Sequence, residues 1–460
     1  MPSADISMIQ GSEDAELTPE QILEIGKTLG IQYDYITVGM NMNPSNMMVL
    51  SSLLAGMTSA GANVRNAGKL PMPALPFASE NTECCVMISN PEDNDRVSGL
   101  TFMNTDGRYF NGPQMFAFRN RLSGKKDLPG YSYVGNVRPY NGALDKYKKK
   151  VTEFVGTADC QIIVDCGSES PSTVVPNIMK AVGADATIVS CQTNFKQRGT
   201  WANPEEYDMR MLSKIVRSTF GSIGAAVNND GTKMAAMDEN GDPIGGDALF
   251  MLFVNYLQPR KVAVPMDITM GIRDQFDGTA LMCKMGSESI GEVMKSEGAE
   301  FGGAPNGMFV FKNNSYAPDG IAAASLLAKI ATETRIGDLI DEIPVYCRDQ
   351  TSIKYPANRE IIAKRISMRV NDLDYRELWV TDGWRVEMES GWFLIRFSDD
   401  EYAIDIKCEG TDKIYTAGMM EIAKDIVTKA IKASQYSPVP LPRPSNCTPS
   451  SCACRRAGRL

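Results

Sequence analysis

Apolar residues along this chain fall into two patterns that predict alternating strands and helices. Short runs rich in β-branched residues are typical of buried strands, and they lie at 161–167, 186–192, 223–227, 261–264 and 309–312. The stretch 204–221 begins with proline and acidic residues and places apolar side chains at helical spacing, namely Met211, Leu212, Ile215 and Val216. Strands that alternate with helices predict an α/β fold.

The C-terminal part of the chain has a different pattern. Residues 384–410 hold three strand-like runs in succession and 417–433 continue as a helix, which predicts a small α+β unit. The last residues, 434–460, are rich in proline, serine and arginine, so we expect a disordered tail. Its cysteines lack the paired C-x₂-C spacing of a zinc site; they are Cys447, Cys452 and Cys454.

Composition limits the classes of protein that this chain can belong to. A length of 460 residues with 43% hydrophobic and 22% charged side chains indicates a globular chain of three or four domains. The formal charge of −9 argues against a nucleic-acid surface. The N-terminus does not resemble a secretory signal and the longest apolar run, 248–257, is too short to cross a bilayer. We therefore expect a cytoplasmic protein that binds neither nucleic acid nor membrane.

Two residue types bear on the chemistry. No histidine occurs in the sequence, which removes the usual general base near neutral pH and the commonest metal ligand. Acid–base chemistry would then fall to Asp, Glu, Lys, Tyr or Cys, and no convincing pair of these stands out. The cysteines before the tail lie in or beside apolar runs and are expected to be buried free thiols: Cys84, Cys85, Cys160, Cys166, Cys191, Cys283, Cys347 and Cys408.

The most informative stretch is 221–247, GSIGAAVNNDGTKMAAMDENGDPIGGD. It resembles the metal loop of the α-D-phosphohexomutase family, in which a strand leads into D-G-D-x-D-R. The resemblance implies a magnesium site, because Mg²⁺ is a hard cation whose dehydration is offset by clustered carboxylates. The three ligand positions are occupied here by Asn228, Asp230 and Thr232, of which only Asp230 can ionise. We therefore expect no bound metal and interpret Asp230 as a turn residue.

The resemblance extends to the N-terminal part, where the family phosphorylates a serine. Residues 68–74 match the family's G-x-x-P-T-P-A, whereas 39–43 lack the arginines and the aspartate of its G-R-D-T-R. An ungapped comparison of 85–107 with the family's T-A-S-H-N-P region places the phosphoserine position at Pro91, which has no hydroxyl. A comparison that aligns the N-P of that region places Ile88 at the serine position and Ser89 at the histidine position. Ser89 is then the nearest hydroxyl and the candidate nucleophile, which requires a further shift in register.

A third loop resembles the family's sugar-selecting segment. Residues 298–311 match G-A-x-F-G-G-E-E-N-G-G, but the glutamate that would accept hydrogen bonds from sugar hydroxyls is replaced by Ala304. Asn306 keeps a polar side chain. We interpret Asn306 mainly as a cap of the turn, with sugar binding as the alternative.

The fourth loop, 396–402, corresponds to the family's phosphate-binding R-P-S-G-T-E-P. Arg396 and Ser398 are retained and could bind an anion weakly. Additional carboxylates in this loop would repel a phosphate dianion, and we expect Arg396 to pair with Asp399 or Asp400.

The resemblance implies an α/β architecture of three similar domains with mixed sheets and a small α+β C-terminal domain. We place these four domains at 1–148, 149–258, 259–362 and 363–433. The fourth domain is expected to close over the cleft between the other three.

The loss of chemical groups at these loops, with structural residues retained beside them, favours a catalytically inactive member of the family. Such a chain would act as a scaffold, structural or regulatory subunit that binds a protein partner or an active relative, and could form a homo-oligomer. One alternative is an active mutase of the phosphomannomutase or phosphoglucomutase type that uses Ser89 and Mg²⁺. Another is a non-catalytic sensor of sugar phosphates.

Overall fold

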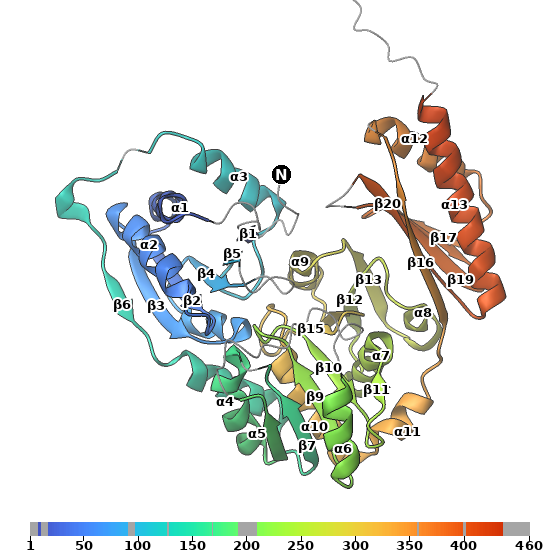
Figure 1. The fold of residues 1–460 in the computed structure, drawn as a ribbon, viewed down its shortest axis with the longest axis horizontal. Coiled ribbons are helices and arrows are strands. Elements are labelled where there is room, and N and C mark those ends of the chain that lie inside the picture. Colours follow the sequence, from blue (N-terminus) through green and yellow to red (C-terminus); the bar gives the residue numbers. More distant parts are fainter. Residues whose placement is uncertain are drawn as a thin grey trace, which may run out of the picture.

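The computed structural model describes residues 8–10, 17–90, 97–126, 128–167, 169–191, 209–356, 358–398 and 402–435. Four β-sheets follow one another along the chain; Figure 1 shows the first and the fourth at opposite sides, with the second and third between them. The predicted α/β class is confirmed. Pro91 and the tail cysteines Cys447, Cys452 and Cys454 lie outside the described residues.

The first sheet is mixed and has the order β1-β5-β4-β2-β3-β6. Its strands are β1 (Met8–Gln10), β2 (Tyr35–Met40), β3 (Asn63–Lys69), β4 (Cys84–Ser89), β5 (Gly99–Met103) and β6 (Val137–Pro139). The accompanying helices are α1 (Pro19–Gln32), α2 (Asn46–Ser59), α3 (Gly112–Leu122) and α4 (Ala143–Val155), with 3₁₀ turns η1 (Met72–Ala78) and η2 (Tyr131–Tyr133). Helix α1 begins at a capping box formed by Thr18 and Gln21, which satisfies its first backbone N–H groups.

The second sheet has the order β11-β10-β9-β7-β8. Its strands are β7 (Gln161–Asp165), β8 (Asp185–Val189), β9 (Ile223–Val227), β10 (Met234–Met237) and β11 (Pro243–Ile244). Its segment also contains η3 (Ser170–Thr173), α5 (Val175–Val182), α6 (Arg210–Ser218) and α7 (Gly246–Leu257). Strands β7, β8 and β9 lie where buried strands were predicted, and α6 falls within the predicted helix.

The third sheet has the order β13-β12-β14-β15. Its strands are β12 (Lys261–Pro265), β13 (Thr279–Cys283), β14 (Phe301–Ala304) and β15 (Met308–Phe311), and its segment contains α8 (Gly271–Gln275), α9 (Ser287–Glu297), α10 (Gly320–Glu333) and α11 (Ile336–Asp341). Helix α10 packs against β9 and β10 of the second sheet, and α7 packs against β14 of the third. Neighbouring units thus exchange helices.

The fourth sheet is antiparallel and has the order β16-β20-β19-β18-β17. Its strands are β16 (Cys347–Lys354), β17 (Glu377–Trp379), β18 (Trp384–Met388), β19 (Gly391–Phe397) and β20 (Ala403–Gly410), covered by α12 (Arg359–Asn371) and α13 (Lys413–Gln435). The three predicted strands are β18, β19 and β20. Strand β16 precedes residue 363, the predicted start of the fourth domain, so this sheet draws on chain before that boundary.

The hydrophobic core differs between the units. One cluster of buried side chains runs through parts of the first three sheets and includes Met72, Val164, Phe250 and Phe301. The fourth sheet has a separate core against α12 and α13. Loops between the first three sheets are therefore held by continuous packing, whereas the fourth unit is attached by other contacts.

Candidate functional site

The loop between β9 and β10 lies where the first three units meet. The Met72 N–H, at the start of η1, donates to the Asp230 carbonyl oxygen at 2.8 Å, and the Gly320 N–H, at the start of α10, donates to the Gly231 carbonyl at 2.9 Å. Gly231 has a φ of +86°, and an added Cβ would lie 3.0 Å from Pro71. Glycine is thus required here by both conformation and space.

The side chains of this loop bind one another. Asp230 Oδ1 accepts from the Thr232 N–H at 3.0 Å and from the Thr232 hydroxyl at 2.6 Å. Asn228 donates from Nδ2 to the Thr232 hydroxyl at 3.1 Å, and its Oδ1 accepts from the Lys233 N–H at 2.9 Å. Asp230 therefore supports the local turn, which is the arrangement that short polar side chains favour.

These residues do not fit a magnesium ion. Mg²⁺ takes a near-octahedral shell of oxygens and is held by carboxylates that offset its charge. Asp230 supplies the single carboxylate of the three ligand positions, and Asn228 and Thr232 are engaged in the loop's own hydrogen bonds. Throughout the described residues, no group of three or more acidic, cysteine or histidine side chains could hold a metal ion.

Ser89 is the last residue of β4 and pairs with Gly99 of β5. Alternation along the strand places it on the same face as Cys85 and Met87, whose side chains belong to the core shared by the first three units. The side chain is buried, with 1% of its surface exposed, and its hydroxyl has no hydrogen-bond partner in the described part of the chain. Burial of an unpaired hydroxyl is costly, which marks Ser89 as a candidate functional group.

Four asparagines surround the backbone next to Ser89, and we call Asn41, Asn43, Asn46 and Asn90 the amide cluster. The Asn90 Oδ1 accepts from the side-chain amides of Asn41, Asn43 and Asn46 at 3.1, 2.9 and 3.4 Å. The Asn90 amide donates to the carbonyl oxygen of Val97 at 2.8 Å. These neutral contacts tie the end of β2 to the end of β4, at the position where the family carries charged residues.

The turn between β14 and β15 holds the residues expected at a sugar loop. Asn306 Oδ1 accepts from the Met308 N–H at 3.2 Å, so this side chain binds its own turn. Ala304 is buried, and the Pro305 carbonyl lies so close to Gly246 that a Cβ at Gly246 would be 1.6 Å from it. The turn is therefore fitted against the start of α7.

The described part of the phosphate-like loop is held by a partner that the sequence did not indicate. The Arg396 guanidinium forms an ion pair with Asp382 at 2.9 Å. Asp382 also accepts from the Met285 N–H at 3.0 Å and so connects the fourth unit to the third. The Ser398 N–H donates to the Ala403 carbonyl at 2.9 Å. The expected partners Asp399 and Asp400 lie outside the described residues.

Sequence reasoning missed a charged boundary between the third and fourth units, defined by Asp247, Asp267, Arg348, Arg385, Glu387, Lys407 and Glu409. Arg348 of β16 forms ion pairs with Glu409 at 2.6 Å and with Asp247 at 2.8 Å. Lys407 pairs with Asp267 at 2.7 Å. Burial raises the pKa of Asp247 to about 7, although Arg348 acts in the opposite direction.

Arg385 is the fully buried cation of the charged boundary. Its guanidinium donates twice to Glu387 Oε1, at 2.9 and 2.6 Å, and to the carbonyl oxygens of Met266 and Ile268 at 2.7 and 2.9 Å. It also stacks 4.2 Å from the ring centre of Trp392. The two carbonyl partners of Arg385 are 119 and 117 positions away in the chain, so no local sequence signal indicates them.

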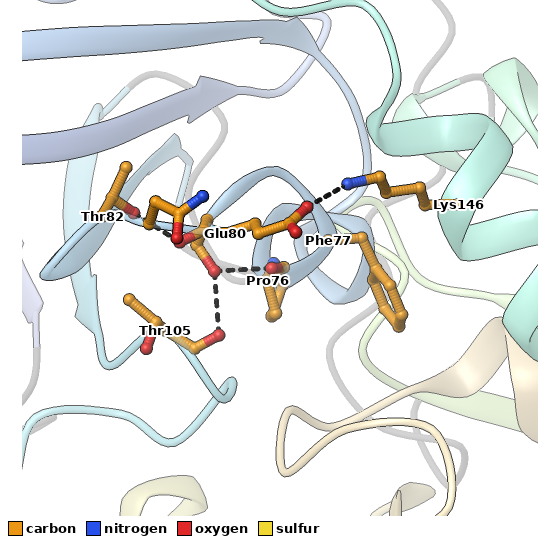
Figure 2. A pocket seen from close by; sticks show the side chains of 8 residues that line it. Pro76, Phe77, Glu80, Thr82, Thr105 and Lys146 are labelled. Atoms are coloured by element: carbon orange, nitrogen blue, oxygen red, sulfur yellow. Dashed lines mark hydrogen bonds and ion pairs between the residues drawn. The ribbon is translucent and has the colours of Figure 1, made fainter.

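Figure 2 shows a separate groove between η1 and α4. Its polar groups bind one another: Lys146 forms an ion pair with Glu80, and the Ser79 hydroxyl donates to the carbonyl oxygens of Pro76 and Thr105. The lining contains none of the loop residues described above. This groove is therefore not the candidate site.

Two family models match this chain. They are phosphoglucomutase/phosphomannomutase α/β/α domain I at residues 4–126 and α/β/α domain III at residues 245–346. The chain belongs to the α-D-phosphohexomutase superfamily, as its motifs predicted. Among the described helices, none combines the length and apolar character required to cross a bilayer.

Curated relatives align over nearly their whole length. A probable phosphoglucosamine mutase of Methanosarcina acetivorans is 28% identical, covering 93% of this chain and 99% of the relative. A phosphoglucosamine mutase of Methanococcus maripaludis is 22% identical, covering 90% of this chain and 96% of the relative.

Solved structures share the fold. A phosphoglucomutase/phosphomannomutase family protein from Burkholderia thailandensis is 20% identical, with a TM-score of 0.80 over 94% of this chain and 97% of that one. An Aspergillus fumigatus N-acetylphosphoglucosamine mutase, solved with GlcNAc-6P and magnesium, is 12% identical, with a TM-score of 0.51 over 87% and 82%.

The expectation of a catalytically inactive scaffold is wrong in the light of these relatives. They are named as mutases and span the chain from its first to its fourth unit. The expectation rested on side chains replaced in loops, and the absence of a family's usual group does not establish that the chemistry is absent. The alternative, a working mutase, is the better supported hypothesis.

Proposed function

We propose that this chain is a hexosamine-phosphate mutase, which moves a phosphoryl group between the 6- and 1-positions of a glucosamine phosphate. The observation that supports it most strongly is the near full-length alignment with relatives named phosphoglucosamine mutase, at 27–28% identity over 93% of this chain for two of them. Alignment over 99% of those relatives includes all four units from which the family's cleft is built.

In this proposal Ser89 carries the phosphoryl group. Its support is positional: Ser89 ends β4, faces the core shared by three units and has a hydroxyl without a partner among the described residues. A serine that waits for a ligand is expected to leave its hydroxyl unused in the ligand-free state. The alternative position, Pro91, has no side-chain hydroxyl to phosphorylate.

The amide cluster acts in this proposal as the support of Ser89. Asn90 follows the serine directly, and three asparagine side chains converge on its Oδ1. Because these bonds join the ends of β2 and β4, they fix the backbone on which the hydroxyl is mounted. Groups held in place by packed hydrogen bonds lose less freedom when they react.

The fourth unit supplies the candidate anion-binding groups, Arg396 and Ser398. A guanidinium can donate two parallel hydrogen bonds to a phosphate. Asp382 holds Arg396 at 2.9 Å and partly offsets its charge, so we expect weaker phosphate binding than an unpaired arginine would give. No step is assigned to Mg²⁺, because the residues of the 228–233 loop do not fit it.

The test is conversion of glucosamine 6-phosphate to glucosamine 1-phosphate by the full chain, followed by a coupled assay of the product. We expect turnover by the native chain and a loss of at least 100-fold in Ser89→Ala, because a residue that forms the covalent intermediate is not replaced by binding alone. Ser98→Ala is the matched control, since the Ser98 hydroxyl donates to Asn46 at 2.7 Å in the same region.

Two outcomes would contradict the proposal. If the folded native chain turns over no hexose or hexosamine phosphate, the proposed mutase activity is contradicted. Turnover that survives in Ser89→Ala and falls in Ser98→Ala would support the mutase activity but contradict the proposed role of Ser89.

A further inference from the structure

Two cysteines follow the ends of neighbouring strands of the second sheet. Strands β7 and β8 are parallel and in register from Gln161 with Asp185 to Asp165 with Val189. Cys166 follows β7 directly, and its N–H still donates to the Val189 carbonyl at 3.2 Å. Paired strands lie roughly 4.8 Å apart, so residues that follow the two strand ends are close in space.

The backbone at Ser190 brings the second thiol to the first. Ser190 has a φ of +52°, the left-handed region that non-glycine residues seldom adopt. This conformation turns the chain directly after β8 and places Cys191 next to the end of β7, where Cys166 lies. Unusual backbone conformations concentrate at sites where a side chain has to be held in a particular direction.

We propose that Cys166 and Cys191 are a redox-active pair that forms a reversible disulfide across the ends of β7 and β8. The two thiols differ in the way that such a reaction requires. Cys166 is fully buried in the core, whereas Cys191 is half-buried. Cys191 is thus the attacking thiol and Cys166 the resolving one.

The charge state of the two sulfurs agrees with these roles. The hydrogen bond from Cys166 lowers the pKa of Cys191 to about 7, against burial and the nearby charge of Asp165, which raise it. The same bond raises the pKa of Cys166. By contrast, burial raises the pKa of Cys160 to about 11 and that of Cys85 to about 12. Thiolates are the reactive form, so Cys191 is distinguished from these cysteines.

The reaction needs a small-molecule disulfide as oxidant. The Cys191 thiolate attacks one sulfur of the reagent, a mixed disulfide forms, and one small thiolate leaves. Cys166 then loses its proton, its sulfur attacks the Cys191 sulfur, and the second small thiolate leaves. Two protein thiols lose two electrons and two protons, and the reagent is reduced to two thiols.

The pair lies beside the loop at the junction of the first three units. Gly167 follows Cys166, and an added Cβ there would lie 3.3 Å from Asn229 Oδ1. The Ser170 hydroxyl donates to the Asn229 carbonyl at 2.7 Å. A disulfide at Cys166 would therefore restrain the segment on which the 228–233 loop rests.

The experiment is disulfide mapping of the native full chain after incubation with oxidised glutathione, alkylation of remaining thiols and digestion with trypsin. We expect a linked pair of the peptides 151–180 and 181–196 that dithiothreitol separates. Cys160 shares the first peptide with Cys166, so the linkage has to persist in Cys160→Ser and disappear in both Cys166→Ser and Cys191→Ser.

The pH dependence of cysteine alkylation gives a second measurement, and misfolding of a variant would not produce the expected shift in its midpoint. Cys191 is expected to react with iodoacetamide with a midpoint near pH 7 in the native chain, and at higher pH in Cys166→Ala, which lacks the hydrogen-bond donor. Glutathione that stays attached to Cys191 without linkage to Cys166, or a Cys191 midpoint that Cys166→Ala leaves unchanged, would overturn the proposal. So would two thiols that remain reduced.

Discussion

The 228–233 loop and the charged boundary are two junctions of the same chain that are built from different chemistry. The loop keeps its shape through amide and hydroxyl hydrogen bonds around one carboxylate, and continuous apolar packing surrounds it. The charged boundary joins the third and fourth units by ion pairs that reach full burial at Arg385. Neutral hydrogen bonds can preserve the shape of a loop after its charged residues are replaced. The stability of a buried charge, in contrast, depends on all of its ion-pair and hydrogen-bond partners.

The largest effect is expected at the charged boundary. Arg385→Met removes a buried guanidinium and leaves the buried Glu387 with Arg273, at 3.2 Å, as its remaining ion-pair partner. Removing one member of a buried pair costs about 3–5 kcal/mol of unfolding free energy. Urea denaturation followed by tryptophan fluorescence, to which Trp392 beside Arg385 contributes, measures this loss.

The matched control for this variant is an exposed pair. Arg217 and Asp242 form an ion pair at 2.8 Å with more than half of each side chain exposed. Arg217→Met is expected to cost less than about 1 kcal/mol. Equal stability of Arg385→Met and Arg217→Met would contradict the contrast between buried and exposed charge.

The loop can be tested by restoring the missing charges. The double variant Asn228→Asp and Thr232→Asp places two carboxylates beside Asp230, whose repulsion should lower the melting temperature in the absence of divalent cations. Mg²⁺ at about 100 times its dissociation constant should then add about 2.7 kcal/mol. The native chain is the control, and we expect no magnesium-dependent shift in it; a shift of the same size there would show that the native loop does bind the ion.

The amide cluster should have a smaller but measurable effect. Asn90→Ala removes the oxygen on which three buried side-chain amides converge. Leaving buried donors unpaired costs about 1–3 kcal/mol, measured by thermal denaturation. Asn120→Ala on the exposed face of α3 should change stability by no more than about 0.5 kcal/mol. Equal melting temperatures for Asn90→Ala and Asn120→Ala would show that the amide cluster does not stabilise the fold.

The smallest expected effect concerns the pH dependence of stability. Burial raises the pKa of Asp247 to about 7, so the folded chain binds a proton there that the unfolded chain has already lost. This contribution to stability is present at low pH and is lost as the pH rises from about 4 to 7. Asp247→Asn should remove about 1–2 kcal/mol of that decline, because the side chain is 27% exposed and partly screened.

The control for the pH profile is Asp242→Asn, whose carboxylate is 65% exposed. The melting temperatures of both variants and of the native chain are measured between pH 4.5 and 8, and the declines with pH are compared. If the decline is the same in Asp247→Asn and Asp242→Asn, Asp247 does not titrate in this range.

Local pattern predicted much of this fold. Strands β7, β9 and β12 and helix α13 were predictable because their apolar spacing has one dominant period. Strand β16 was not predicted, because its alternating exposed residues give a weak apolar signal and its pairing with β20 is a long-range contact. The sequence indicated which loops matter, but it could not place Asp382 beside Arg396 or bring Cys191 to Cys166. Those contacts depend on tertiary structure and on one left-handed residue.

Phosphorus NMR of the native chain with glucosamine 6-phosphate, combined with phosphopeptide mapping, tests the central proposal most directly. The account predicts the resonance of glucosamine 1-phosphate at equilibrium with its isomer and a single phosphorylated site at Ser89, absent from Ser89→Ala. An unchanged spectrum from folded chain, with Ser89 unmodified, would contradict it.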